Sequence, residues 1–178
     1  MLKTLAEHWT RLRANAWSAL AFDVAVLVLL FLGVHAWQTR DLPIAEPAPA
    51  TVLPLLDRPG SMSAVQPGAA GVVYFFAPWC GVCRVSIDNL DELVAAGRVP
   101  WGVVVALDYA DPDEVRDFIE ETGVSLPVLM GDARTAADWS IRGFPTYYVI
   151  DADGQIASRS VGYSTWAGMW FRAWRAKF

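Results

Sequence analysis

The sequence predicts an α/β sandwich with a central mixed β-sheet, preceded by one N-terminal transmembrane helix. After residue 51, apolar runs of strand length alternate with amphipathic stretches of helix length, which is typical of parallel strands joined by helices. Near the end of the chain, two strand-like runs flank a tight turn and add antiparallel strands. Ahead of the whole pattern, residues 16–37 are apolar, with Asp23 as their single charge.

The individual elements follow from apolar spacing and from helix-end signals. Residues 72–76 and 102–107 are unbroken apolar runs, as expected of strands that are buried on both faces of a sheet. Asp111 and Pro112 form a helix start, and Gly123 is the matching end. The expected strands are 72–76, 102–107, 126–129, 146–150 and 155–161, and the expected helices are 80–96, 111–123, 132–139 and one from about residue 164.

Two patterns near the C-terminus have ordinary structural interpretations. Residues 151–154 contain the first acidic positions of a calcium-binding loop but lack the rest, so we interpret them as the hairpin turn. Trp166, Trp170 and Trp174 recur at helical spacing, and we interpret them as the core-facing side of the last helix.

Residues 16–37 are long enough to cross a membrane as a helix. At 1.5 Å per residue they reach roughly 33 Å, against a bilayer core of about 30 Å. Lys3, Arg11 and Arg13 precede this segment, whereas only Arg40 follows it closely. The positive-inside rule therefore places the N-terminus in the cytoplasm and the rest of the chain outside the inner membrane, in the periplasm or outside the cell.

A cleaved signal peptide is the alternative interpretation of this segment. The uninterrupted apolar run from Val24 to Val34 is short, and residues 48–50, Ala-Pro-Ala, resemble a cleavage site. That site lies farther beyond Val34 than cleavage sites usually do, and Trp37 resembles an interfacial anchor. We therefore expect a retained anchor.

These features divide the chain into four parts. Apolar residues recur at helical spacing ahead of the span, as in a helix that lies on the membrane surface, although a frayed tail is the alternative. Pro43, Pro47 and Pro49 stiffen the stretch after the span into an extended spacer. The expected parts are a cytoplasmic amphipathic segment 1–15, a transmembrane signal anchor 16–37, a Pro-rich linker 38–51 and the α/β domain 52–178.

Charge and cysteine content exclude two classes of protein. Residues 41–178 hold ten Lys/Arg against seventeen Asp/Glu, and this acidic balance argues against a nucleic-acid partner. The chain has only two cysteines, Cys80 and Cys83, so it lacks the disulfide framework that stabilises small secreted domains. Both histidines, His8 and His35, precede residue 41.

Cys80 and Cys83 are the candidate catalytic residues. The strand at 72–76 leads through a short turn to Cys80, where an amphipathic helix begins, so the first thiol is expected at a helix N-terminus. Free backbone N–H groups and the helix dipole at that end favour the thiolate and would lower its pKa from about 8.5 to about 7. Cys80 then acts as the nucleophile. Cys83, one turn further on, is expected to lie beneath Cys80 and to be less exposed, where it resolves the mixed disulfide.

Three other roles for the pair remain as alternatives. An inert disulfide that closes four residues would stabilise the fold by only about 2 kcal/mol, against about 3 kcal/mol for a fifteen-residue loop. Two thiolates could hold Cu(I), a soft ion, which makes a copper-binding protein the rival function. Zinc is disfavoured because it prefers four ligands and the domain offers no further Cys or His. The third alternative is that the protein acts as a non-catalytic scaffold. The oxidoreductase itself needs no cofactor or resident metal.

The motif around the cysteines resembles that of the thioredoxin superfamily. Trp79-Cys80-Gly81-Val82-Cys83 follows a buried strand, and Gly143-Phe144-Pro145-Thr146 stands before another. A lone C-x-x-C motif is a moderately specific indicator of this superfamily, and its combination with the downstream motif is a strong indicator. From about residue 52 to 174 the chain resembles the membrane-anchored TlpA-like proteins and, more closely, the suppressor-for-copper-sensitivity D type, which are protein disulfide oxidoreductases.

This resemblance implies further site residues and a thioredoxin-like fold. Cys80 and Cys83 would form a redox-active disulfide. Pro145 would follow a cis peptide bond and face the two cysteines, and the backbone of Phe144 would pair with the substrate peptide. Trp79 would help to position that substrate.

Two positions depart from the family pattern. Thioredoxin has a buried Asp, and many TlpA-like proteins an Asn, where this chain has Tyr74. TlpA-like reductases often have a Glu where Ser86 stands. The sequence therefore identifies no general base, and water is the expected proton acceptor for Cys83.

The resemblance implies a membrane-tethered periplasmic thiol–disulfide oxidoreductase that reduces or isomerises disulfides of exported proteins. Its partners would be those client proteins, a membrane protein that donates or accepts electrons, and the inner membrane through residues 16–37. The direction of electron flow depends on a redox potential in which about 30 mV corresponds to about 1.4 kcal/mol. The sequence leaves that direction open.

Overall fold

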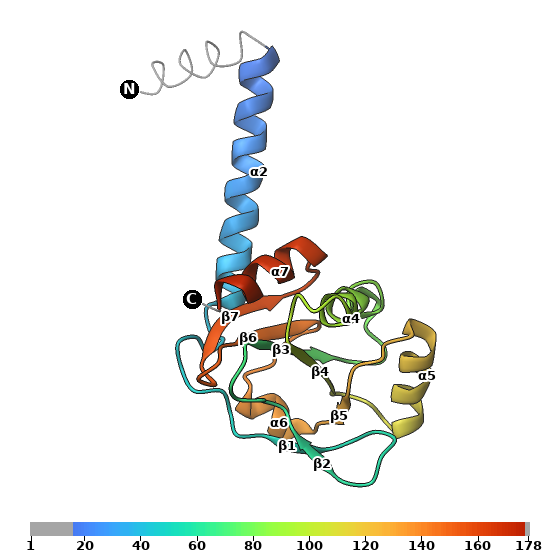
Figure 1. Cartoon of the computed structure of the whole chain (residues 1–178). Coiled ribbons are helices and arrows are strands. Elements are labelled where there is room, and N and C mark those ends of the chain that lie inside the picture. Colours follow the sequence, from blue (N-terminus) through green and yellow to red (C-terminus); the bar gives the residue numbers. More distant parts are fainter. Residues whose placement is uncertain (1–15, 177–178) are drawn as a thin grey trace. The chain divides into compact units, whose positions relative to one another are not determined.

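A computed structural model describes residues 16–176 of the chain. It contains two compact units, one ending at Arg40 and the other beginning at Asp41. The first contains helix α2 (Ala16–Thr39), and the second is an α/β domain (Figure 1). The amphipathic segment expected over residues 1–15 lies outside the described residues.

Helix α2 has the length and composition of a membrane span. Among the described residues, Ser18–Thr39 is the one helical segment long and apolar enough to cross a bilayer. Its large side chains are not buried within the protein, since Leu27, Leu29 and Phe31 are 66%, 68% and 70% exposed. A helix that exposes apolar side chains in this way is suited to lipid.

The second unit is built on a five-stranded mixed sheet, which confirms the predicted architecture. Its strand order is β5-β4-β3-β6-β7. The first three of these strands are parallel, whereas β6 is antiparallel to β3 and β7 is antiparallel to β6. The strands are β3 (Gly71–Phe76), β4 (Trp101–Ala106), β5 (Val128–Met130), β6 (Thr146–Ile150) and β7 (Ile156–Val161).

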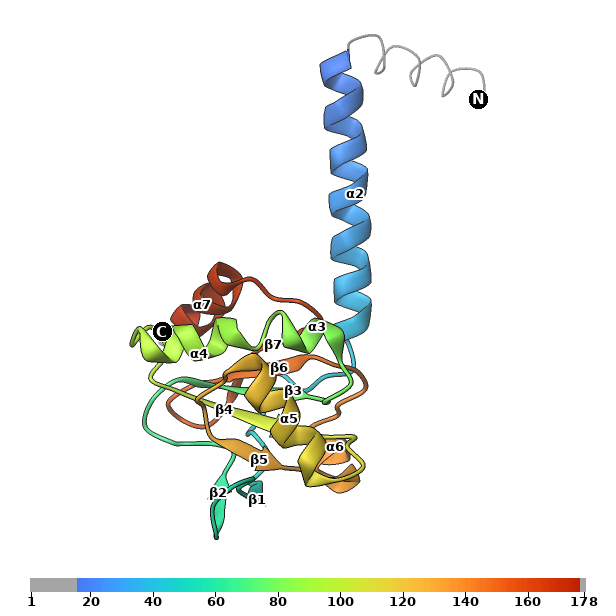
Figure 2. The ribbon, with the colours of Figure 1, turned by 90° about the vertical axis from the view of Figure 1, so that its right-hand side faces the viewer.

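The central strands are buried on both faces because their side chains alternate between two cores. On β3, Val72, Tyr74 and Phe76 pack into one core, and Val73 and Phe75 pack into the other. One face of the sheet is covered by helices α4, α5 and α7, and the opposite face by α6 (Figure 1 and Figure 2). These helices are α4 (Asp88–Ala95), α5 (Pro112–Thr122), α6 (Ala133–Asp138) and α7 (Trp166–Arg175).

The helix expected over residues 80–96 is divided in two. A turn separates α3 (Gly81–Arg84) from α4. In that turn the Ser86 hydroxyl donates to the Val82 carbonyl oxygen over 2.8 Å, and such a side-chain bond competes with the helical ladder and bends it. The prediction of one continuous helix is therefore wrong at this point.

A short N-terminal hairpin was not expected from the sequence. Strands β1 (Val52–Pro54) and β2 (Ser61–Ser63) pair in antiparallel fashion. Just after β1, the Leu56 N–H donates to the Val128 carbonyl oxygen over 3.0 Å, so this segment covers the outer edge of β5. Three-residue strands are too short to show a two-residue period, which is why the pattern did not reveal them.

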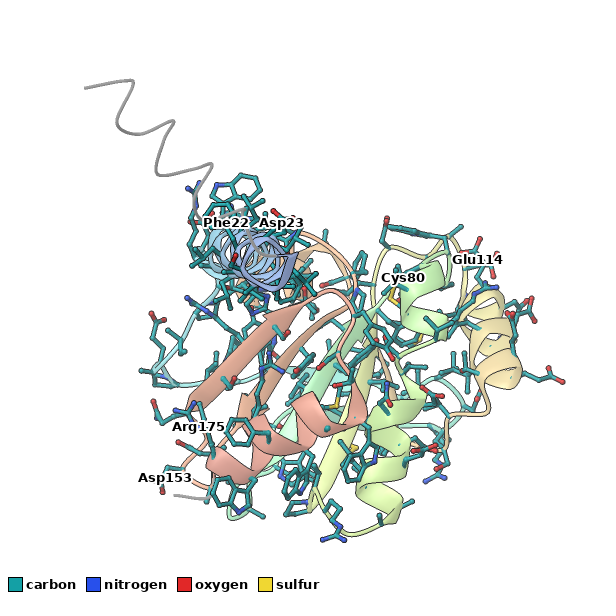
Figure 3. The ribbon with its side chains drawn as sticks, turned by 90° about the horizontal axis from the view of Figure 1, so that it is seen from above. Phe22, Asp23, Cys80, Glu114, Asp153 and Arg175 are labelled. Atoms are coloured by element: carbon teal, nitrogen blue, oxygen red, sulfur yellow. A yellow bond between two sulfur atoms is a disulfide. The ribbon has the colours of Figure 1, made fainter. Side chains whose placement is uncertain are left out.

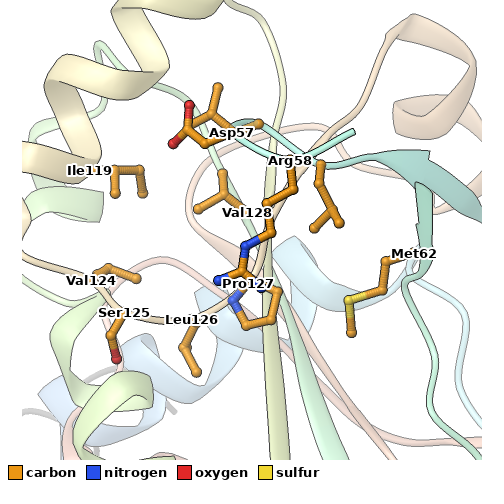
Figure 4. Close-up of a pocket in the computed structure, with 11 residues that line it drawn as sticks. Asp57, Arg58, Met62, Ile119, Val124, Ser125, Leu126, Pro127 and Val128 are labelled. Carbon is orange, nitrogen blue, oxygen red and sulfur yellow. The ribbon is translucent and has the colours of Figure 1, made fainter. Parts of the chain in front are cut away.

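A pocket of about 270 Å³ lies between this hairpin, the start of β5 and the end of α5 (Figure 4). Its lining is mostly apolar and includes Leu56 and Ile119, while Asp57 and Arg58 contribute the charged groups. Asp57 also pairs with Arg116 over 3.0 Å. None of these residues belongs to the candidate active site.

The proline-rich segment, expected to be an extended spacer, is docked on the domain over much of its length. The Ala45 N–H donates to the Ile156 carbonyl oxygen over 2.9 Å. Leu42 is only 5% exposed and lies in the core beneath α6. The compact domain therefore begins at Asp41, earlier than the expected boundary at residue 52, because backbone groups between the prolines find partners along β7.

Helix α7 buries a different face from the one expected. Met169 and Ala173 are its buried residues. Trp166 and Trp170 are partly buried and pack at the margin of the core, but Trp174 is 44% exposed. The interpretation of the tryptophan stripe as a core face is therefore wrong for Trp174.

Candidate active site

Cys80 lies where strand β3 gives way to helix α3. Its N–H donates to the Ala77 carbonyl oxygen over 3.0 Å, which closes the turn after the strand. Cys80 is the N-cap residue of α3, and its Sγ accepts a hydrogen bond from the Cys83 N–H over 3.1 Å. The structure therefore places the first cysteine at the start of the helix, as the sequence predicted (Figure 3).

The two cysteines form a disulfide, but they differ in exposure. Their Cα atoms are 5.2 Å apart. Cys80 is 5% exposed, whereas Cys83 is fully buried. Of the two sulfurs, only that of Cys80 belongs to a residue that retains contact with solvent.

Pro145 lies next to the start of β6, and the peptide bond before it is cis, as the resemblance implied. Because β6 is antiparallel to β3, with Thr146 opposite Phe75, the segment that precedes β6 lies beside the segment that follows β3. Pro145 is buried, and its carbonyl oxygen accepts a hydrogen bond from the Gly162 N–H over 2.8 Å. The sheet therefore brings the loop before Pro145 to the same end as Cys80.

Trp79 joins three loops at this end of the sheet. Its ring meets that of Phe144 edge-on, with centroids 5.7 Å apart. Its indole N–H lies 3.1 Å from both the carbonyl oxygen and the carboxylate Oδ2 of Asp108, just after β4. Even so, Trp79 is 63% exposed, so it offers a flat apolar surface beside Cys80.

Two residues that support this arrangement were not expected from the sequence. Asp108 fixes the Trp79 indole, and Arg84 donates to the Pro78 carbonyl oxygen over 3.0 Å, which holds the loop ahead of Cys80. The position of Asp108 directly after a buried parallel strand was the available signal, because such strand ends meet at the same edge as the cysteines.

A hollow of about 450 Å³ opens beside Phe144 and Asp108. Most of its other lining comes from the segment after β4 and from the start of α6, namely Leu107, Tyr109, Gly131, Asp132, Ala133 and Ala136. Burial raises the pKa of the Tyr109 hydroxyl, and the Asp132 carboxylate raises it further. The hollow is mainly apolar and provides room for a side chain next to Trp79 and Phe144.

Tyr74 lies in the same core as the two cysteines and is connected to the turn after α3. Its hydroxyl is 2.8 Å from the Ser86 Oγ, and Ser86 donates its own proton to the Val82 carbonyl oxygen. Tyr74 is therefore the donor in the pair. Burial raises the pKa of the Tyr74 hydroxyl well above its ordinary range, so the group stays neutral.

Comparison with known proteins identifies the family. The family model described as Redoxin matches residues 44–168, more than half of the chain. The thiol:disulfide interchange protein CycY of Rhizobium leguminosarum bv. viciae is 36% identical over 124 residues, which cover 68% of this chain and 63% of CycY. The chain thus spans slightly less than two thirds of that relative.

Two further similarities agree with this match. The thiol:disulfide interchange protein HelX of Rhodobacter capsulatus is 32% identical over 141 residues, which cover 73% of this chain and 78% of HelX. The crystal structure of a thiol:disulfide interchange protein of the thioredoxin family from Chlorobium tepidum TLS has a TM-score of 0.66 at 25% identity and covers 75% of this chain and 97% of that one. The chain therefore belongs to the Redoxin family and has a thioredoxin-like fold.

Proposed function

We propose that this protein is a membrane-tethered oxidoreductase whose domain lies in the periplasm and reduces or isomerises disulfides of exported proteins. The observation that carries the proposal is the asymmetry of the cysteine pair, with Cys80 at a helix start and slightly exposed, and Cys83 one turn further on and fully buried. CycY and HelX are both named thiol:disulfide interchange proteins, which supports the same chemistry for this chain.

The reaction has two exchange steps. In the reduced protein, the Cys80 thiolate attacks one sulfur of the client disulfide, so a Cys80–client bond forms and the client's own S–S bond breaks. The Cys83 thiolate then attacks the Cys80 sulfur, the client leaves as a dithiol after taking up two protons, and the Cys80–Cys83 disulfide remains. Two electrons pass to the client, and a dithiol of a membrane partner reduces the pair again.

Proton transfer in this reaction is assigned to water. The Cys83 N–H donates to the Cys80 sulfur in the disulfide and would stabilise the Cys80 thiolate in the reduced protein. Tyr74 stays neutral because of its burial, and residues 41–178 contain no histidine. We therefore assign solvent water, which enters when the mixed disulfide forms, as the acceptor of the Cys83 proton.

The client chain would lie across Trp79, Phe144 and Pro145. The exposed Trp79 ring and its contact with Phe144 form an apolar surface next to Cys80. By the resemblance, the backbone of Phe144 would pair with the client's backbone, while the adjoining hollow takes one client side chain. Trp79, Phe144 and Pro145 would thus position the disulfide, and the cysteines would carry out the exchange.

Helix α2 would anchor the protein in the inner membrane. Lys3, Arg11 and Arg13 ahead of it favour a cytoplasmic N-terminus and a periplasmic domain. Extraction of membranes at alkaline pH tests the anchor, because a spanning protein stays in the pellet. Release of the full chain into the supernatant would contradict a membrane anchor.

Cysteine variants test the exchange mechanism. Cys80→Ser is expected to abolish reduction of an insulin-like disulfide substrate, because it removes the nucleophile. Cys83→Ser is expected to keep the first attack and to accumulate mixed disulfides, which can be isolated without reductant and identified. The double variant is the matched control, and equal amounts of trapped client in Cys83→Ser and in the double variant would contradict the assigned roles.

The direction of electron flow is tested by equilibrium titration against glutathione. We expect a reducing potential, well below that of the strong oxidant DsbA at about −120 mV. A potential close to that value would reverse the assignment and make the protein a disulfide donor. The names of the three similar proteins do not support the Cu(I)-binding alternative. Stoichiometric copper binding without disulfide turnover would support it.

A further inference from the structure

We infer that the outward face of α7 docks on the anionic surface of the membrane that α2 spans, so that the domain lies against the bilayer. The inference rests on the proposed membrane anchor and adds to it an interaction surface and an orientation. Four features of the chain support it.

The outward face of α7 is apolar where a surface helix is ordinarily polar. Its exposed residues are Ala167, Phe171, Trp174 and Arg175, which recur at helical spacing. Phe171 is 50% exposed and Trp174 is 44% exposed, and their rings stack with centroids 6.1 Å apart. An exposed aromatic pair beside an arginine is typical of helices that lie in the membrane interface.

Charge is distributed unevenly along the domain. Residues 41–154 hold six Lys/Arg against seventeen Asp/Glu, whereas residues 155–178 hold four against none. Helix α5 is rich in acids, and Glu114 at its start lies on the opposite side of the domain from Arg175 (Figure 3). An anionic lipid surface would therefore attract α7 and repel α5, which orients the domain.

Two arginines of α7 line a hollow suited to a lipid phosphate. Arg172 and Arg175 border a space of about 220 Å³ together with Ser158 and Ile44. Arg172 is held in place by a 3.0 Å hydrogen bond to the Tyr147 hydroxyl. Guanidinium groups bind phosphate oxygens through directed, charge-assisted hydrogen bonds, so this hollow is the expected place for a phospholipid headgroup.

The short segment between α2 and the hollow, residues 40–43, keeps the hollow close to the membrane. Ile44, in the wall of the hollow, follows Thr39, the last residue of α2, by only five positions. An extended chain covers at most about 3.6 Å per residue, or roughly 18 Å over this stretch. Ala45 and Ala48 are hydrogen-bonded to the domain and add no length. The last turn of α7 is therefore confined to the neighbourhood of the lipid headgroups.

Site-specific photo-crosslinking of the full chain tests the docking. p-Benzoylphenylalanine replaces Phe171 in one variant and Val52 in a control, since Val52 is 64% exposed on β1. Both are reconstituted in liposomes of phosphatidylcholine with a minority of phosphatidylglycerol and no other protein. We expect a lipid adduct at position 171 with a yield several-fold above that at position 52.

Charge variants in the same assay test the role of the arginine. Arg175→Glu is expected to reduce the lipid adduct at position 171 by about fivefold or more, the effect of about one cationic residue at an anionic surface. Arg134→Glu is the matched control, because the Arg134 side chain is 88% exposed on α6. It is expected to leave the yield unchanged. Retained disulfide reduction shows that Arg175→Glu is folded, since α7 lies outside the proposed exchange machinery, and an unchanged urea midpoint shows that Arg134→Glu is folded.

The remaining outcomes separate this inference from the proposed function. Equal adduct yields at positions 171 and 52 would overturn the docking. A crosslink from position 171 to a protein in native membranes, with none to lipid in liposomes, would show that α7 faces a partner protein and would also overturn it. Failure of the chain to enter liposomes would remove both the anchor and the docking, whereas entry without the adduct would remove the docking alone.

Discussion

Ser86 and Tyr74 show how single residues hold the turn between α3 and α4. The Ser86 hydroxyl has one proton, which it donates to the Val82 carbonyl oxygen over 2.8 Å. It can therefore only accept from Tyr74, whose hydroxyl is 2.8 Å away in the buried core. Removing the Ser86 hydroxyl and removing the Tyr74 hydroxyl therefore have different effects on the hydrogen bonds that remain.

Removal of Ser86 is expected to cost more than removal of the Tyr74 hydroxyl. Ser86→Ala leaves the buried Tyr74 hydroxyl without an acceptor and should lower the free energy of unfolding by about 1–3 kcal/mol. Tyr74→Phe leaves Ser86 bonded to Val82 and should lower it by about 0.5–1.5 kcal/mol. Urea unfolding of both variants measures the difference, and a larger loss for Tyr74→Phe would reverse the donor assignment.

Tyr74→Phe also tests the assignment of proton transfer to water. Burial raises the pKa of Tyr74, so its hydroxyl carries no charge where thiols react, and its removal should leave the pH dependence of disulfide reduction unchanged. Tyr148→Phe is the matched control, since Tyr148 is buried on the other face of the sheet and donates to the Trp139 carbonyl oxygen over 2.6 Å. A shifted pH profile in Tyr74→Phe alone would give Tyr74 a part in proton transfer.

Among the elements, α6 borders the hollow beside Phe144 and is fixed at its start by a capping box. The Asp132 carboxylate accepts from the Thr135 N–H over 2.8 Å, while the Thr135 hydroxyl accepts from the Asp132 N–H over 3.3 Å. The backbone hydrogen bond from Thr135, followed by its side-chain bond, lowers the pKa of Asp132 below its ordinary value of 3.8. The charged carboxylate is thus part of what stabilises this helix.

The Asp132 cap is expected to make stability depend on acid pH. Because the folded-state pKa is lowered, the contribution is fully present above the ordinary pKa and is lost as pH falls through the lowered one. Asp132→Asn keeps an N-cap acceptor but cannot be protonated in this range. Its urea midpoint should therefore fall less than that of the native protein between about pH 5 and about pH 3. Parallel acid dependence in the two proteins would contradict the assignment.

For the whole molecule, the unit that folds together extends back to residue 41, close to the end of α2. Leu42→Ala removes a side chain that is 5% exposed and should lower the free energy of unfolding by about 2–5 kcal/mol. Ile44→Ala, two positions on and 46% exposed, is the control and should change it by no more than about 0.5 kcal/mol. Denaturant unfolding of the full chain in detergent measures both. No loss for Leu42→Ala would mean that this stretch is the free spacer its prolines suggest.

Local patterns in the sequence were enough to predict the sheet and the cysteine pair. Residues 72–76 and 102–107 are unbroken apolar runs because both faces of those strands are buried, and the structure has strands there. Asp111 caps α5 and Gly123 ends it in a left-handed conformation, as the end signals indicated. Such signals depend on residues within one or two turns, so they can be recognised without the fold.

Contacts between distant segments leave no such local signal in the sequence. Asp108 contacts Trp79 although the two are 29 residues apart, and no spacing of residues in the sequence predicts that contact. The docking of Ala45 on Ile156 overrides the extended spacer that the prolines favour, because its backbone partner lies on β7, a strand far away in the sequence.

The sequence by itself determined the mixed sheet, the apolar helix and the position of Cys80 at a helix start, since each depends on the period and end signals of a single segment. Only the tertiary structure decided that Asp108 holds Trp79 and that α7 presents Phe171 and Trp174 outward. Exposure and long-range hydrogen bonds are properties of how segments pack against one another, and a linear pattern does not contain them.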